Sequence, residues 1–181
     1  SSNYSTITYT PGTFTITKKA LTVTPTAGQS VVYGTASPSY AFTVTGFAGS
    51  ETAANAAGYS APTCSASGYS ATLAFGSSAF TISCSGGSAT NYSFITTATT
   101  TATIAKASLT VSAEAKSVDY GAVAPTLTFG VSGWRNSESA ANAAGYGAPT
   151  CSSSYSRTSP AGTPVAITCS GATATNYSFS Y

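Results

Sequence analysis

The chain has 181 residues, a formal net charge of +2 and only 6% charged residues, and it contains neither His nor Met. Because His is absent and the four carboxylates are scattered singly, the usual groups for acid–base catalysis and metal binding are missing, and we expect no enzyme, cofactor or metal site. The small net charge argues against nucleic-acid binding, and no apolar run is long enough to span a membrane.

Short strands are predicted along the whole chain. An apolar content of 42%, with 12% aromatic residues, indicates a folded protein, and hydroxyl side chains replace charges at its surface because about a third of the residues are Ser or Thr. Apolar and polar residues alternate with a period of two, and Gly, Pro, Ser and Asn separate the alternating stretches, as in an all-β sandwich. The clearest alternations fall at residues 13–17, 21–24 and 40–45.

Two Ala-rich stretches differ from this pattern. Residues 51–59 read ETAANAAGY and residues 138–146 read ESAANAAGY. Because alanine favours helix and the stretches are short, we expect one or two helical turns in each.

One unit recurs along the chain, which indicates a recent tandem duplication. Residues 51–64 return almost unchanged as residues 138–151, and Tyr-Gly-x-x-x-Pro occurs at Tyr33 and again at Tyr120. A third repeated motif, Asn-Tyr-Ser, begins at Asn3, Asn91 and Asn176.

The repeated motifs divide the chain into three segments. Residues 20–106 form repeat 1, and residues 107–181 form repeat 2, which lacks a counterpart of the closing strand of repeat 1. Residues 1–19 match the sequence that starts at Ala89, so they are expected to be the tail strand of a preceding repeat. The N-terminal part of the chain thus carries a spare closing strand, and repeat 2 lacks one.

Four cysteines lie at matching places, two in each repeat. This even, repeated placement predicts one disulfide within each repeat, Cys64 to Cys84 and Cys151 to Cys169. Metal binding is the alternative, but neither His nor a Cys-x-x-Cys pair accompanies the cysteines. Disulfides predict an extracellular or cell-surface location.

The repeated motifs resemble those of a known family. A Leu-Thr-Val opening at residues 21–23 and 109–111, Tyr-Gly with a later Pro, and a closing Asn-Tyr are similar to the MBG repeat, YGX type, of bacterial surface adhesins. The resemblance covers nearly the whole chain. It implies a small immunoglobulin-like β module, strung in long arrays on secreted or surface proteins, and the family name suggests binding to glycans or mucins.

The predicted fold is therefore all-β, with two tandem immunoglobulin-like β-sandwich modules, one disulfide in each, and an N-terminal donor-type strand. A sandwich without its last strand exposes unpaired backbone groups and an apolar cleft, which the donor strand of a neighbouring copy is able to fill. We predict the assembly strand at Thr13, Phe14, Thr15, Ile16 and Thr17. We predict the acceptor end at Asn176, Tyr177, Phe179 and Tyr181.

These features predict a structural subunit or repeat period of a bacterial extracellular filament or surface adhesin, assembled head to tail. The partners expected are neighbouring copies, and glycans or host and biofilm surfaces are further candidates. The alternative is a spacer or glycan-binding segment of a long adhesin array without self-assembly.

Several other residues allow two interpretations. The Asn-Tyr-Ser sites at Asn3, Asn91 and Asn176 fit N-glycosylation, but a turn in which Asn bonds its own backbone explains them equally. For Tyr33, Tyr120 and Trp134 we favour packing at the core or at a junction over sugar binding. For Lys18, Lys106 and Lys116 we favour solvated lysines over isopeptide bonds to Asn55 or Asn142.

Overall fold

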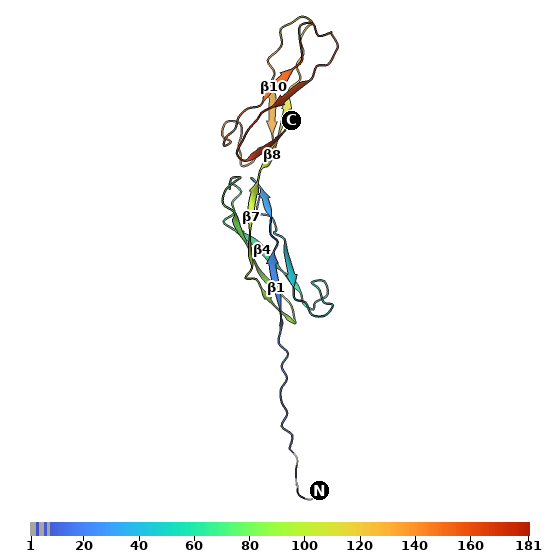
Figure 1. Ribbon diagram of the computed structural model, residues 1–181, viewed down its shortest axis with the longest axis vertical. Coiled ribbons are helices and arrows are strands. Elements are labelled where there is room, and N and C mark those ends of the chain that lie inside the picture. The colour runs from blue at the N-terminus through green and yellow to red at the C-terminus, as the bar shows by residue number, and fades with distance from the viewer. Residues whose placement is uncertain (1–2, 4–5, 7) are drawn as a thin grey trace.

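The computed structural model describes residues 3, 6 and 8–181. Two elongated halves follow one another along a long axis, and the N-terminal residues extend away from the first half (Figure 1). Strands are the only regular elements among the described residues, which confirms the all-β prediction. Within the same part of the chain, no helix is present that is suited to crossing a membrane.

Repeat 1 is built from two sheets. One has the strand order β3-β1-β6 and the other the order β2-β7-β5-β4. The β1–β6 and β2–β7 pairs are parallel, and the remaining pairs are antiparallel. The strands are β1 (Lys19–Pro25), β2 (Ser30–Val32), β3 (Phe42–Thr45), β4 (Ser60–Ser67), β5 (Phe80–Ser88), β6 (Tyr92–Ile95) and β7 (Thr99–Ala105).

Repeat 2 contains the same arrangement with fewer strands. Its sheets have the orders β12-β8-β9 and β10-β11, which correspond to β6-β1-β3 and β4-β5 of repeat 1. Among the described residues, repeat 2 has no counterpart of β2 or β7. Its strands are β8 (Ala107–Ala113), β9 (Phe129–Ser132), β10 (Thr150–Ser153), β11 (Ile167–Ser170) and β12 (Tyr177–Ser180).

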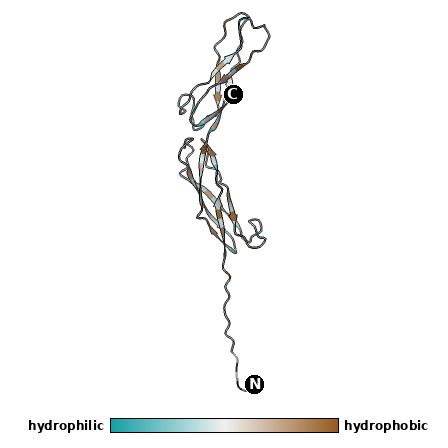
Figure 2. Ribbon diagram, viewed as in Figure 1, coloured by the Kyte–Doolittle hydropathy of each residue, from teal (hydrophilic) through white to brown (hydrophobic). Residues whose placement is uncertain are grey.

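Alternating side chains form the core. Leu21 and Val23 in β1 and Ile82 in β5 are completely buried, while the threonines between them face solvent. Leu109 has the place of Leu21 in repeat 2 and is also completely buried. Figure 2 shows this pattern as hydrophobic residues alternating with paler ones along the strands. The period of two in the sequence therefore places one face of each strand in the interior.

The two halves are joined by a very short connection. β7 ends at Ala105 and β8 begins at Ala107, so Lys106 alone separates the last strand of repeat 1 from the first strand of repeat 2. The connection leaves little freedom for one repeat to rotate against the other.

No helix forms at the Ala-rich stretches, and the one or two helical turns predicted for each are reduced to a single hydrogen-bonded turn. The Oδ1 atom of Asn55 accepts the backbone amide of Thr52 at 2.6 Å, and the amide of Ala56 reaches the carbonyl of Thr52 at 3.0 Å. Gly58 follows with a φ of 64°, which ends the turn. The stretch is too short to offset the cost of starting a helix, so its alanine content does not decide its structure.

Candidate assembly site

β7 shows how a closing strand fits a repeat. It lies between β2, with which it pairs in parallel, and β5, with which it pairs antiparallel. Ala102 is opposite Phe80, and Ile104 is opposite Val31. Ala102 and Ile104 are 1% and 6% exposed, and both belong to the core. The closing strand therefore contributes two apolar side chains and two ladders of backbone hydrogen bonds.

Repeat 2 has an open groove at the corresponding place. Its volume is about 640 Å³, and its walls come from residues 113–127 and 153–167, which Figure 1 shows as long loops and strand ends far from the N-terminus. The large apolar and aromatic side chains along its walls include those of Val118, Tyr120, Leu127, Tyr155, Val165 and Ile167. Their counterparts in repeat 1, in the same order, are Val31, Tyr33, Tyr40, Tyr69, Phe80 and Ile82.

The groove leaves residues exposed that are buried in repeat 1. Val118 is 39% exposed and Tyr120 is 70% exposed, whereas Val31 and Tyr33 are each 4% exposed. Residues 117–119 do not form a strand. Their counterpart β2 has β7 as its strand partner, so among the described residues this segment has no ladder partner without a closing strand.

The N-terminal segment (residues 8–18) has the sequence of a closing strand but is unpaired. It extends away from repeat 1 in Figure 1, and Phe14 and Ile16 are 92% and 87% exposed. The predicted assembly residues Thr13 to Thr17 all lie in this segment, and all of them face solvent. Its last residue is anchored, because Lys18 Nζ donates to the carbonyl of Ala89 at 3.0 Å.

The structure places the predicted acceptor residues elsewhere. Tyr177 and Phe179 lie in β12 and pair with β8, and Asn176 is buried just before that strand. Tyr181 follows β12, and its hydroxyl oxygen accepts a hydrogen bond from the backbone amide of Ala172 at 2.9 Å. None of these residues lines the groove, because the chain crosses from one sheet to the other between the counterparts of β6 and β7.

A polar and aromatic junction connects the two repeats. The hydroxyl of Tyr33 donates to Oε1 of Glu138 at 3.0 Å, and the hydroxyl of Tyr177 donates to Oε2 of the same carboxylate. The rings of the two tyrosines meet edge to face at 5.6 Å. Asn176 Oδ1 accepts the amide of Phe75 at 2.9 Å. Burial and the hydrogen bond to Glu138 raise the pKa of Tyr177 to about 12, so this hydroxyl stays protonated as a donor.

The comparisons with known proteins identify these repeats. The family model of the MBG domain, YGX type, matches residues 21–102 and 109–181. The chain belongs to this family. Neither a curated protein nor a solved structure matches the chain. The match supports a tandem repeat protein, and together with the disulfides it is consistent with an extracellular location.

Each MBG repeat contains its own disulfide, as the sequence predicts. Cys64 and Cys84 are directly opposite each other on β4 and β5, with Cα atoms 3.9 Å apart. Cys151 and Cys169 have the same positions on β10 and β11, with Cα atoms 4.0 Å apart. Both bonds therefore join neighbouring strands of one sheet, and no described cysteine is free.

The recurring lysines of the MBG repeats bind backbone rather than asparagine side chains. Lys106 Nζ donates to the carbonyl of Ala174 at 3.3 Å, which repeats the contact of Lys18 with Ala89. Lys116 forms an exposed ion pair with Glu114 at 3.4 Å. The possible isopeptide partners Asn55 and Asn142 are engaged in local turns.

The other ambiguous residues also have structural positions. Trp134 packs edge to face against Tyr177 at 5.3 Å and is half-buried against the core. Among the possible glycosylation sites, Asn176 is 5% exposed and bonded, so its side chain is closed to a glycan in this fold. Asn91 and Asn3 are exposed. Tyr4 and Ser5, the rest of the first Asn-Tyr-Ser, lie outside the described residues, as do residues 1, 2 and 7 of the predicted tail strand.

Sequence reasoning missed the role of the recurring glutamates. Glu51 accepts the hydroxyl of Tyr92 in repeat 1, as Glu138 accepts that of Tyr177 in repeat 2. The hydrogen bond to Glu51 raises the pKa of Tyr92. The available signal was that two of the four carboxylates occupy the same place in both repeats.

Proposed function

We propose that this chain is a structural subunit of a bacterial extracellular filament or surface adhesin, in which copies join head to tail by β-strand addition. In this arrangement, residues 11–17 of one copy form the closing strand of repeat 2 in a second copy, and each completed repeat is an immunoglobulin-like β-sandwich. The donor and acceptor surfaces differ, so the contact is heterologous and propagates as an open fibre.

β7 supplies the expected register. Because Phe14 and Ile16 have the places of Ala102 and Ile104, the added strand would run parallel to residues 117–119 and antiparallel to β11. Ile16 would lie opposite Val118 and Phe14 opposite Val165. Pro11 would stand at the first position of the strand, where a missing N–H is tolerated.

The observation that carries the proposal is an exchange of a large and a small side chain. In repeat 1, Phe80 on β5 is opposite Ala102 on β7. In repeat 2, the place of Phe80 is taken by Val165, and the closing-strand residue available for the groove is Phe14. In repeat 1 the large side chain is on β5 and the small one on the closing strand, whereas in repeat 2 the large side chain would be on the closing strand. The exchange keeps the total side-chain volume of the pair similar.

The opposite wall of the groove also has a smaller side chain than the corresponding wall of repeat 1. In repeat 1, the ring of Tyr40 packs against Phe80 with centroids 6.3 Å apart. Leu127 has the place of Tyr40 and carries no ring. The groove of repeat 2 thus lacks two aromatic rings present in repeat 1, while Phe14 presents one exposed ring at the matching register. This fit favours the N-terminal segment of a second copy as the occupant.

A structural rather than catalytic role is part of the proposal. Glu51 and Glu138 accept tyrosine hydroxyls, and Glu114 accepts Thr128 and pairs with Lys116, so these carboxylates are engaged in holding the fold. The low charge and the many hydroxyls suit a fibre that is exposed to varying salt.

Electron microscopy of the protein at neutral pH, with a denaturing reducing gel, tests the proposal. We expect filaments that dissolve to a 17.9 kDa species, and we expect a peptide of residues 8–18 to shorten them by occupying the groove. The same peptide with Ile16→Asp is the control and should have no effect. Dispersed particles that bind no peptide would refute assembly. A single very large band would show instead that the groove is filled within one long array, which is the spacer alternative.

A further inference from the structure

We infer that joined copies also meet end to end, through a contact that repeats the junction between repeats 1 and 2, with Tyr120 of one copy donating to Glu51 of the next. This inference rests on the proposed strand addition, because the inserted strand brings the two ends together. It adds a second interaction surface, which adjoins the groove at Tyr120, and it identifies residues that orient one copy on the next.

The intrachain junction supplies the template. Tyr33 at the end of repeat 1 donates to Glu138 at 3.0 Å, and the amide of Phe75 donates to Asn176 at 2.9 Å. Gly34 lies directly under Arg135, where a Cβ on residue 34 would overlap the Arg135 side chain. The two ends are therefore joined by a hydroxyl that donates to a carboxylate, by an amide that donates to a side-chain oxygen, and by a glycine packed against an arginine side chain.

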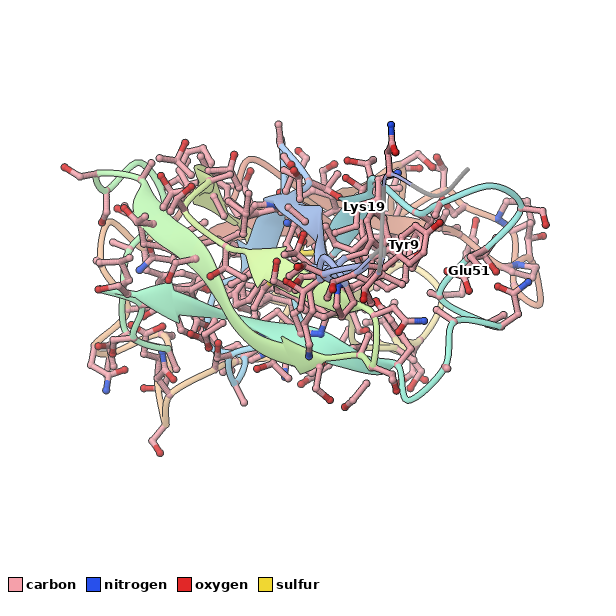
Figure 3. All side chains as sticks on the ribbon, turned by 90° about the horizontal axis from the view of Figure 1, so that it is seen from below. Tyr9, Lys19 and Glu51 are labelled. Carbon is pink, nitrogen blue, oxygen red and sulfur yellow. A yellow bond between two sulfur atoms is a disulfide. The ribbon has the colours of Figure 1, made fainter. Side chains whose placement is uncertain are left out.

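The tyrosine, the glutamate and the asparagine of this junction have counterparts at the outer ends of the chain, whereas Arg135 is replaced by Ala48. Tyr120, the counterpart of Tyr33, is 70% exposed and therefore available at the end of repeat 2. Glu51 and Asn91, the counterparts of Glu138 and Asn176, are at the opposite end, and Asn91 is exposed there whereas Asn176 is 5% exposed. Figure 3 looks onto this end of repeat 1 along the long axis, with Glu51 and Lys19 labelled.

The short connection forces the two ends together. Within the chain, Lys106 alone lies between β7 and β8. Lys18 has the same place between the N-terminal segment and β1, which begins at Lys19, and both lysines bond the same carbonyl position of the following repeat. A copy whose N-terminal segment fills the groove must therefore set the Glu51 end of its repeat 1 against the Tyr120 end of the acceptor.

The two junctions differ at the loop that holds Asn136, and this difference affects their relative strength. In the intrachain junction, Asn136 Nδ2 donates to the carbonyl of Ala71 at 3.0 Å. Its counterpart Gly49 has no side chain, so the contact between copies lacks this hydrogen bond. Gly49 and Asn136 have nearly the same backbone conformation, with φ of 55° and 52°, and an asparagine is tolerated there. Copy-to-copy joints are therefore the weaker of the two kinds.

Critical concentration for assembly, measured by sedimentation, tests the inference. Tyr120→Phe removes the hydroxyl and keeps the ring, so it should raise the critical concentration about tenfold, as for loss of a hydrogen bond to a charged group. Gly121→Asn, which places a side chain where the next copy approaches, should raise it further. Gly49→Asn should lower it severalfold. Tyr9→Phe, at an exposed tyrosine before the inserted strand, is the control and should leave it unchanged.

Binding of a fluorescent peptide of residues 8–18 separates the two ideas. The peptide reaches the groove without a repeat behind it, and Gly49 does not line the groove, so the affinity of the peptide for Gly49→Asn should equal that for the unaltered chain. If Gly49→Asn and Tyr120→Phe both assemble at the unaltered critical concentration while the unaltered chain binds the peptide, the end-to-end contact is refuted and strand addition stands. If the unaltered chain neither assembles nor binds the peptide, both inferences fail.

Discussion

Phe14 and Val165 offer the sharpest test of strand addition. Phe14 is 92% exposed in the separate chain, and its counterpart Ala102 is 1% exposed, so insertion would take Phe14 from solvent into the core of repeat 2. Burial of a Phe side chain contributes about 1.5–3 kcal/mol, and truncation of a packed Phe to Ala costs about 3–5 kcal/mol because a cavity remains. Phe14→Ala should therefore raise the critical concentration for assembly by roughly a hundredfold or more.

The compensating change supplies the internal control. Val165→Phe crowds the inserted Phe14, and overpacking of this kind costs about 1–3 kcal/mol, which is at least roughly a tenfold increase in critical concentration. The double variant Phe14→Ala with Val165→Phe places the large side chain on the wall and the small one on the strand, as in repeat 1. We expect it to assemble better than either single variant, with a coupling of about 1–3 kcal/mol.

Sedimentation at fixed salt and pH gives the critical concentrations, and thermal unfolding of each variant shows that the separate chain is intact. Tyr9→Ala truncates another exposed aromatic residue of the N-terminal segment and should have no effect. If the double variant shows only the sum of the two single penalties, Phe14 and Val165 do not meet and the register is wrong. If Phe14→Ala assembles like the unaltered chain, strand addition itself is refuted.

Three further predictions concern the separate chain. Replacing both cysteines of repeat 1, with Cys64→Ser and Cys84→Ser, should lower the free energy of unfolding by about 3 kcal/mol. Denaturant titration measures this loss, which arises because a loop with a sequence separation of 20 is no longer closed. Tyr177 has its pKa raised from 10.0 to about 12, so its contribution to stability is complete below pH 10 and lost as the pH rises through 12; ultraviolet titration should show a late-ionising tyrosine that Tyr177→Phe removes. Gly34→Ala should lower the melting temperature more than Gly121→Ala, because both have positive φ but only residue 34 faces Arg135; equal effects would contradict the close approach.

The sequence predicted those parts of the fold that depend on local pattern and repetition. The alternation at residues 21–24 corresponds to β1, and the matched cysteines correspond to the two disulfides. The same local reasoning failed for residues 51–59, where alanine content favours helix but the Thr52 turn and Gly58 determine the structure. Local propensity is outweighed wherever a segment is too short to nucleate a helix.

The candidate site was predictable only in part, because it depends on contacts far apart in the sequence. The closing-strand character of residues 13–17 follows from their match to β7. The location of the groove does not, since its walls are built from residues 113–127 and 153–167, whereas residues 177–180 lie in the opposite sheet. The role of Glu138 depends on Tyr33, which is 105 residues away in sequence. No pattern in a single sequence reveals that pairing.

The single-residue connection at Lys106 also determines how the molecule transmits tension. Figure 1 shows β1 and β7 running along the long axis, so a pulling force enters repeat 1 through β1 and leaves through β7 directly into β8. The ladders that hold these strands lie across the direction of pull, and their hydrogen bonds are strained in shear and must break together rather than one after another. Because the single residue Lys106 adds almost no extensible length, we expect a pulled chain to lengthen only when a whole strand detaches from its sheet.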